Sequence, residues 1–507
     1  MSIIVRLIGI LFLSAGIVGL MYTTDLLDGI TVPAQVAFKM YPMSTAPPDE
    51  KISDYLKSRL ESAHPDERIP VIIELTAPTR SFTGKITGAL AMAQQAEVIP
   101  KLQAYDFNLQ IATHYVANML AGTVPAKYVE EIARDPNVKA IYLDKYQWKL
   151  TEDVDEKMYV KLLRESVPMI GVPDVWDEGY TGKGVVVIII DSGVMDSHPW
   201  LIRNGKSLVL TEYDIAPGVD YTHWHGTHCA GIIASQDPTY RGVAPDIEGF
   251  VDILAFDNRG GATDSWIISA LDTAYQVAVE YKQQGYAVVA TNSWGGPAQD
   301  NPTVNKMREM VMNIADEIPI VFAAGNEGPS PSTIGAPGDA DRGDNEAITV
   351  CAVNKYGTIA SFSSRGPDKY GEDHNEPDIC APGVGIMSSV PGGMNTASGT
   401  SMATPHIAGV IALMLQKNPT LTNMQVFEYL TSTAIDAGDP GFDFDYGYGI
   451  VDTKAAVDAV PEAPLPSSPA ASGEIVIGAV QLVSVILIIF GLAMTLKPDE
   501  FAGGVGL

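Results

Sequence analysis

The chain has 507 residues, of which 46% are hydrophobic and 18% are charged, so the composition predicts a large folded core and excludes a chain that is disordered throughout. Acidic residues outnumber basic residues by 61 to 32, which gives a formal net charge of -29. A surface of that sign repels nucleic acid and anionic lipid headgroups, so we exclude nucleic acid as a partner.

The chain begins with a hydrophobic segment. Residues 7–21 are an apolar run of fifteen residues that follows Arg6. Such a run is short for a spanning helix and is typical of the core of a signal peptide. No clean small-x-small cleavage site follows, so an uncleaved anchor stays open as the alternative. We therefore predict a signal peptide or an N-terminal membrane anchor over residues 1–30 and a linker over residues 31–67.

A small α+β domain is predicted over residues 68–150. Its expected elements alternate in the order strand, helix, two strands, helix and strand, at 71–75, 88–102, 106–125, 126–136 and 137–144. This β-α-β-β-α-β order is the signature of a ferredoxin-like fold.

A larger domain is predicted over residues 166–460, after a connector over residues 151–165. Val185 to Ile190 is an unbroken β-branched run, which is typical of a strand that is buried on both faces of a parallel sheet. Similar runs, with helical patterns between them, recur at 286–295, 318–328 and 347–353. This alternation predicts a doubly wound, mostly parallel α/β sheet, in which ligands collect at the carboxyl ends of the strands.

The C-terminal part predicts a membrane anchor. A proline- and serine-rich linker over residues 461–474 leads into residues 475–496, which are apolar except for Gln481 and long enough to span a bilayer. A short tail over residues 497–507 begins with Lys497, which favours a cytoplasmic C-terminus. The expected location is therefore the cell membrane, with the catalytic domain on its extracytoplasmic side and the lipid bilayer as a partner.

Three histidines and a cysteine fall within the stretch "HWHGTHCAG", from His223 to Gly231. The stretch allows a metal site, one catalytic base with neighbours, or buried polar groups on a helix. The zinc-protease signature HExxH is absent, because no glutamate lies between His223 and His228. We therefore set metal catalysis aside.

Three further polar residues stand where an α/β sheet gathers ligands. Asp191 follows the β-branched run, Asn326 follows another predicted strand, and Ser401 lies near the start of a long apolar helix. Each has a structural alternative, as a turn aspartate, a turn asparagine or a helix N-cap. The functional interpretation is a carboxylate, an amide donor for a carbonyl oxygen, and a nucleophile at a helix start that favours negative charge.

In chain order these residues are Asp191, His225, Asn326 and Ser401, and the motifs around them resemble the subtilisin-like serine proteases, the subtilases. The matching stretches are "IIIDSGV", "HGTHCAGII", "NSWGG", "AAGNEGP", "SGTSMATPHIAG" and "YGYGIVDTKAAV". The resemblance covers about residues 166–460.

The resemblance implies a role for each residue. Ser401 attacks the peptide carbonyl, His225 takes the proton of its hydroxyl, Asp191 orients the imidazole ring, and Asn326 with the Ser401 backbone N–H holds the oxyanion. It also implies a set of substrate-binding residues, namely Ser293, Trp294, Gly295, Gly260 and Gly335.

The resemblance further implies that residues 68–150 are an inhibitory propeptide and hence an intramolecular partner of the protease. The precursor is then expected to cut itself between Leu150 and Glu165, with Leu150 as the expected residue before the cut. In the histidine cluster, His228 is expected to be buried and structural, and His223 to lie in a surface loop.

The three cysteines, Cys229, Cys351 and Cys380, are too few and too unevenly spaced for a disulfide framework or a CxxC metal site. At most one disulfide can form, and we expect each cysteine to be a small buried hydrophobic residue. If His225 begins a helix, Cys229 lies one turn on, directly behind the base.

No cofactor is needed for this chemistry, and no metal ligand is assigned. The resemblance allows structural Ca²⁺, but Trp200 stands where the family often has a calcium-binding aspartate, and the loop "SQDPTYR" is short for the family's calcium loop. The acidic stretch at 338–346 is either an alternative calcium site or a solvated loop.

The leading hypothesis is therefore a membrane-anchored, secreted serine endopeptidase that acts on protein or peptide substrates and is made as a self-processed zymogen. The alternative is a catalytically silent subtilase fold that serves as a binding or scaffolding module.

Overall fold

The computed structural model describes residues 41–80, 86–151, 163–217, 223–370 and 375–463. The predicted signal peptide or anchor at 1–30 and the predicted transmembrane helix at 475–496 lie outside these residues. In the described part of the chain, no helix is both long enough and apolar enough to cross a membrane.

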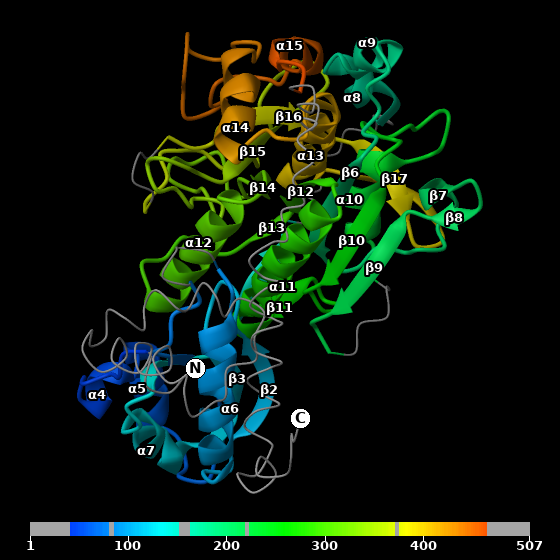
Figure 1. Ribbon diagram of the computed structural model, residues 1–507. Helices are drawn as coiled ribbons and strands as arrows, with labels where there is room; N and C mark the ends of the chain where they lie inside the picture. Colours follow the sequence, from blue (N-terminus) through cyan, green and yellow to red (C-terminus); the bar gives the residue numbers. More distant parts are fainter. Residues whose placement is uncertain (1–40, 81–85, 152–162, 218–222, 371–374, 464–507) are drawn as a thin grey trace, which may run out of the picture. The chain divides into compact units, whose positions relative to one another are not determined.

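The N-terminal domain has the predicted element order. Its antiparallel sheet runs β2-β3-β1-β4, with β1 (Arg68–Leu75), β2 (Asn108–Thr113), β3 (Met119–Pro125) and β4 (Val138–Leu143). Two helices complete the alternation, α6 (Ala89–Gln103) and α7 (Val129–Ala133), the latter after a 3-10 turn at Ala126–Tyr128 (Figure 1).

The expected linker before this domain is partly folded. It contains α4 (Pro48–Lys51) and α5 (Asp54–Glu61), and Leu56 of α5 is fully buried in the core of the N-terminal domain. The linker prediction was wrong for this stretch, because the spacing of its few apolar residues was too weak to reveal a helix that packs on a sheet.

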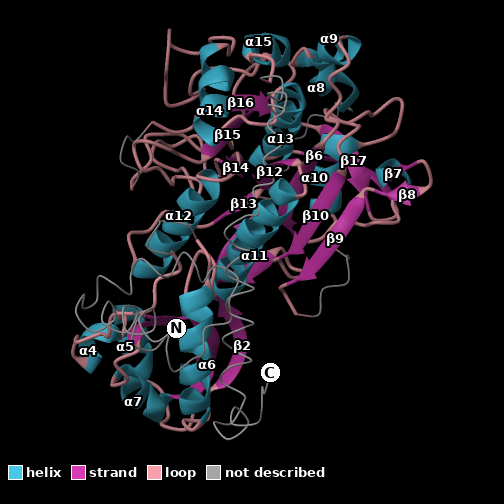
Figure 2. Cartoon of the chain, in the orientation of Figure 1, coloured by secondary structure: helices cyan, strands magenta, loops and turns pink. Residues whose placement is uncertain are grey.

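The second domain is built on a seven-stranded parallel sheet, as predicted. Its order is β16-β15-β14-β12-β6-β10-β9, with β16 (Ile379–Pro382), β15 (Ile348–Val353), β14 (Ile320–Ala323), β12 (Ala287–Asn292), β6 (Val185–Asp191), β10 (Gly249–Leu254) and β9 (Val209–Asp214) (Figure 2). The order reverses direction at β6, which lies between β10 and β12. Such a switch point is where an open parallel sheet binds its ligands.

Successive residues of β6 enter two different hydrophobic cores. Val185, Val187 and Ile189 pack into one core, and the alternate residues of the strand pack into the other. The first core is covered by α8 (Leu163–Met169), α9 (Val172–Asp177), α10 (His225–Ala234), α13 (Thr400–Lys417), α14 (Asn423–Ser432) and α15 (Thr453–Ala459). The second is covered by α11 (Asp264–Gln283) and α12 (Pro302–Ala315), which lie side by side (Figure 1). A strand buried on both faces explains the unbroken β-branched run.

The smaller elements lie around this sheet. They are the two-stranded pairs β7 (Ile202–Arg203) with β8 (Lys206–Ser207) and β17 (Ile386–Val390) with β18 (Gly393–Ala397), and a 3-10 turn at Pro199–Leu201. A three-stranded sheet joins the two domains, because β5 (Tyr146–Leu150) pairs antiparallel with both β11 (Gly261–Thr263) and β13 (Trp294–Gly295).

Cys351 and Cys380 form a disulfide between the neighbouring strands β15 and β16, where they are register partners. Both are fully buried. The expectation that these two cysteines are merely small buried hydrophobic residues was therefore wrong. Their separation of 29 residues gives no sign in the sequence that β15 and β16 place them side by side.

Candidate active site

Asp191 and His225 form a buried pair at the switch point of the sheet. Asp191 is the last residue of β6 and His225 the first residue of α10, and their side chains are 1% and 0% exposed. The His225 Nδ1 lies 2.8 Å from Asp191 Oδ1 and 3.0 Å from Oδ2. This contact favours the tautomer with the proton on Nδ1, which leaves Nε2 as the basic nitrogen. Among the described residues, Nε2 is buried and has no hydrogen-bond partner.

Ser401 is the second residue of α13 and is fully buried. Its hydroxyl donates to the Ser293 carbonyl at 2.9 Å and also contacts the Thr151 hydroxyl. The residue therefore has the expected helix-start position, but its hydroxyl is not directed at His225 in this structure. The Thr151 side chain and the Ser293 carbonyl hold it instead.

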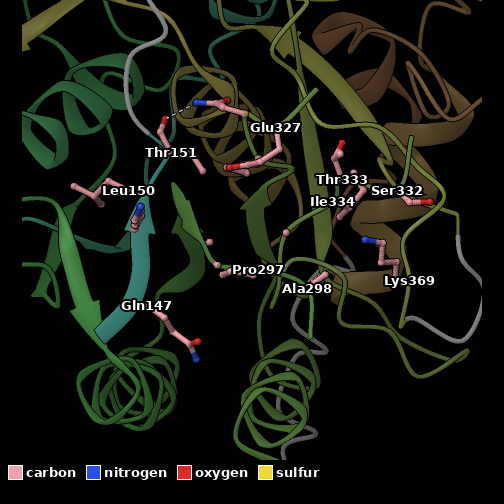
Figure 3. Close-up of a pocket in the computed structure, with 17 residues that line it drawn as sticks. Gln147, Leu150, Thr151, Pro297, Ala298, Glu327, Ser332, Thr333, Ile334 and Lys369 are labelled. Atoms are coloured by element: carbon pink, nitrogen blue, oxygen red, sulfur yellow. Dashed lines mark hydrogen bonds between the residues drawn. The ribbon is translucent and has the colours of Figure 1, made fainter. Parts of the chain in front are cut away.

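Asn326 follows β14 and points its amide at the end of β5. Its Nδ2 donates to the Thr151 carbonyl oxygen at 3.0 Å, which is the dashed line from Thr151 in Figure 3. Its Oδ1 accepts from the Thr400 backbone N–H and from the Thr400 hydroxyl, each at 3.0 Å. Because these two donors fix which end of the amide is the oxygen, the nitrogen must face Thr151.

The strand β5 lies in the site as an extended peptide. The Leu150 N–H donates to the Gly260 carbonyl at 3.0 Å, and the Thr151 N–H donates to the Ser293 carbonyl at 3.2 Å. The structure thus brings the Thr151 carbonyl, and not that of Leu150, to the Asn326 amide. Which carbonyl lies there depends on the register of β5 with β13, which the sequence alone does not show, and Leu150 as the residue before the cut stays a prediction.

A cavity of about 700 Å³ extends beside Thr151 (Figure 3). Two of the predicted substrate-binding residues, Gly295 and Gly335, line it. Gly295 also pairs with residues 146–151, as do Ser293, Trp294 and Gly260. Glu327 and Lys369 bring charges of both signs to its wall. The cavity is therefore lined both by glycine backbone and by charged side chains.

Of the other histidines in the cluster, His228 is buried as predicted. Its Nε2 lies 3.1 Å from the Ile386 carbonyl, and burial lowers the pKa of its imidazole to about 3. His223 is also buried, with 8% exposure, and its Nδ1 lies 3.2 Å from the Ser192 hydroxyl. The expectation of a surface loop was wrong for His223, because the ring packs back against the residue that follows Asp191.

Cys229 lies one helical turn beyond His225, as the sequence predicted. Its Sγ is 3.9 Å from His225 Nδ1 and 3.5 Å from the Ser401 carbonyl oxygen. Asp191, His225 and Cys229 place ligand atoms within 4.8 Å of one another. They do not fit a metal ion, since Nδ1 shares its proton with Asp191 and burial raises the pKa of the thiol well above its usual range.

At the two places where the sequence suggests calcium, several side chains have protein partners. Trp200 stacks on Tyr240 of the short loop, with ring centroids 5.4 Å apart, and so replaces an oxygen ligand with an aromatic contact. In the acidic stretch at 338–346, Asp339 forms a buried ion pair with Arg308 at 2.6 Å. Asp344 pairs with Arg342 at 2.8 Å, so Asp339 and Asp344 each have an arginine partner.

Asp191, His225, Asn326 and Ser401 are the residue types that a serine endopeptidase uses, and the comparisons with known proteins identify the chain as one. Residues 182–449, just over half of the chain, match the Subtilase family. Subtilisin E of Bacillus subtilis (strain 168) is 36% identical over 374 residues, which are 73% of this chain and 87% of that protein. The chain therefore belongs to the subtilase family.

Two further relatives are also similar to this chain. The serine protease AprX of Bacillus subtilis (strain 168) is 30% identical over 370 residues, covering 66% of this chain and 78% of that protein. The alkaline elastase YaB of Bacillus sp. (strain YaB) is 33% identical over 333 residues, covering 65% of this chain and 79% of that protein.

Proposed function

We propose that this subtilase is exported, anchored in the membrane and made as a self-inhibited precursor that cuts its own chain after Thr151. One observation carries the self-cleavage part of the proposal. The Thr151 carbonyl oxygen accepts from Asn326, and the Ser401 hydroxyl lies beside the same residue. This position supports the proposal, since a peptide bond beside a serine hydroxyl and an amide donor has the neighbours that cleavage needs.

The chemistry follows from these positions. His225 Nε2 takes the proton of the Ser401 hydroxyl as its oxygen bonds to the Thr151 carbonyl carbon, and Asp191 stabilises the resulting imidazolium. The carbonyl oxygen becomes an oxyanion that Asn326 Nδ2 and the Ser401 backbone N–H hold. When the Thr151–Glu152 bond breaks, the imidazolium returns its proton to the departing amine of Glu152, and water then releases Thr151 from Ser401.

The N-terminal domain acts as the inhibitor in this proposal, because β5 fills the cleft between β11 and β13. A second contact supports it. Asp272 of α11 accepts backbone N–H bonds from His114, Tyr115 and Val116 at 3.1, 2.8 and 2.7 Å. One buried carboxylate therefore holds the segment that directly follows β2.

Two features support export and anchoring. A disulfide such as Cys351–Cys380 is typical of proteins outside the reducing cytosol. The apolar segments at 7–21 and 475–496 are, in sequence, an export signal and a membrane anchor. A chain truncated after Glu474 should be released into the medium as active protease, and recovery of that chain only in the cytosol would contradict export.

The self-processing test uses the full-length chain. The wild-type protein should yield a mature enzyme whose first residue is Glu152, and Ser401→Ala should leave the chain intact with an unchanged circular dichroism spectrum. A mature N-terminus before Asp144 would contradict the inhibitor assignment. Processing of Ser401→Ala at the wild-type rate would favour the alternative of a silent module that is cut by another protease.

A further inference from the structure

Trp148 is the fourth residue before the proposed cut, and it is only 1% exposed. Its ring packs edge-on against Trp294, with centroids 5.9 Å apart at an interplanar angle of 90°. On another side it lies against the Gly296 backbone so closely that a Cβ there would come within 2.8 Å of the indole ring. Ala262 on β11 is its register partner. The indole therefore occupies a closed apolar site in the catalytic domain.

One polar group faces this apolar site. Asp264, the first residue of α11, accepts from the Trp148 indole Nε1 at 2.7 Å through its Oδ1. The same oxygen accepts from the Gln147 amide at 2.8 Å, and Oδ2 accepts from the Lys145 backbone N–H at 3.4 Å. Asp264 is itself 1% exposed.

The donors to the Asp264 carboxylate come from one short segment of the chain. Every hydrogen bond that the described residues make to the Asp264 carboxylate comes from residues 145–148. When β5 leaves the cleft, the carboxylate is left without these donors, although it lies in the wall of the catalytic domain. A group positioned in this way is built to receive an extended peptide rather than to stabilise its own domain.

The charge of Asp264 decides which peptide fits. Burial raises the pKa of its carboxyl to about 6, so at pH 7 and above it is mostly ionised and can only accept hydrogen bonds. A hydrocarbon ring in the same place would remove the 2.7 Å indole donor from this buried carboxylate and leave Gln147 and Lys145 as its donors, and such a loss costs more in a buried site than in water.

We propose that Asp264 is a specificity-determining residue, which selects a large side chain with an N–H donor, tryptophan above all, four residues before the scissile bond. The inference rests on the proposed function, since the position of Trp148 is counted from the proposed cut after Thr151. The walls formed by Trp294 and Gly296 select for size and flatness, and Asp264 selects for the N–H.

The test is a pair of quenched fluorescent peptides with the sequence of residues 146–153. One carries tryptophan at the position of Trp148, and the other carries 3-benzothienylalanine, which keeps the ring shape but has sulfur in place of the N–H. The enzyme is the active protease that matures from the expressed full-length chain. We expect kcat/KM to fall about 10- to 100-fold for the second peptide, the range for one unsatisfied hydrogen bond to a charged group.

Asp264→Ala should bring the two kcat/KM values within about twofold of each other, because the acceptor is gone. Asp257→Asn is the matched control, since Asp257 accepts from Tyr146 two residues away on the same strand, and it should leave the ratio between the peptides unchanged. The ratio of the two kcat/KM values of the wild-type enzyme tests the role of Asp264 even if Asp264→Ala does not fold.

The outcomes separate the two claims. Cleavage of both peptides at the Thr–Glu bond with equal kcat/KM would overturn the role of Asp264 and leave the proposed function intact. Cleavage of neither peptide, or cleavage that persists in Ser401→Ala, would overturn the proposed function and this inference with it.

Discussion

The Thr151 carbonyl oxygen lies 3.0 Å from Asn326 Nδ2, at the point where β5 ends against the catalytic domain. An amide donor at that distance already hydrogen-bonds the ground-state carbonyl, and its bond strengthens when the carbonyl becomes an oxyanion. Thr400 holds the other end of the amide, so the donor is preorganised by two hydrogen bonds within the catalytic domain.

Replacing Asn326 tests this donor. Asn326→Ala should lower kcat for peptide hydrolysis by about 10²–10³, the usual cost of one oxyanion donor, with a much smaller change in KM. Steady-state kinetics on the mature enzyme measure both constants. Asn326→Asp is the matched variant, since it keeps an oxygen for Thr400 but removes the N–H. A loss of tenfold or less in both variants would mean that the Ser401 backbone N–H suffices.

A buried histidine should make the fold sensitive to acid. His406 of α13 lies 2.8 Å from the Met402 carbonyl through Nδ1 and 2.8 Å from the Ser166 hydroxyl through Nε2. Burial lowers the pKa of its imidazole to about 4, from 6.5 in an exposed chain. Below pH 6.5 the unfolded chain therefore binds a proton that the folded chain does not, and stability falls from pH 6.5 towards about 4.

Thermal melts of Ser401→Ala protein between pH 4.5 and 7.5 measure this slope without self-digestion. In that background His406→Gln should lower the melting temperature at pH 7 but flatten its decline below pH 6.5. His64→Gln is the control, because the His64 side chain is exposed. An unchanged slope in His406→Gln would assign the acid sensitivity to other groups, of which the similarly buried His228 is the next to test.

The disulfide should contribute measurably to stability. Closing a loop with a sequence separation of 29 residues is worth about 3–4 kcal/mol in the chain-entropy model. The free energy of unfolding of the Cys351→Ala/Cys380→Ala double variant should therefore be lower by about that amount, with a midpoint at lower denaturant concentration. Denaturation of Ser401→Ala protein with and without the pair gives the difference. Dithiothreitol should shift the midpoint of the parent and leave that of the double variant unchanged.

The sequence predicted the parts of the site that local pattern controls. The β-branched run of β6 predicts that Asp191 ends a strand, and the small residues around Ser401 predict a helix start. Both positions could therefore be predicted from the sequence alone. The N-terminal element order was likewise visible from the spacing of apolar residues alone.

The parts that the sequence did not reveal depend on register and on contacts between distant segments. The pairing of Cys351 with Cys380 needs the alignment of β15 with β16, and the position of Thr151 needs the alignment of β5 with β13. The sequence did not identify Asp264 as a site residue. An aspartate at the first position of a helix is common, because it caps the helix and interacts favourably with the helix dipole. Its role depends on the indole that the N-terminal domain brings to it.

The free cysteine behind His225 gives the last prediction. Cys229 Sγ lies 3.9 Å from His225 Nδ1, and it is fully buried with a thiol pKa raised well above its usual range. The thiol is therefore protonated and does not compete with Ser401 as a nucleophile. A mercuric ion that reaches it adds bulk against the imidazole and displaces it from Asp191.

We therefore expect mercuric chloride to abolish peptide hydrolysis by the mature enzyme, and a peptide aldehyde bound in the cleft to slow the inactivation. Cys351 and Cys380 are not competing targets while their disulfide is intact. Cys229→Ala should remain active, because alanine fits the space of a small buried side chain, and it should resist mercury. If Cys229→Ala is inhibited as strongly as the wild type, mercury acts elsewhere, and the short distance between the thiol and the imidazole has no consequence for activity.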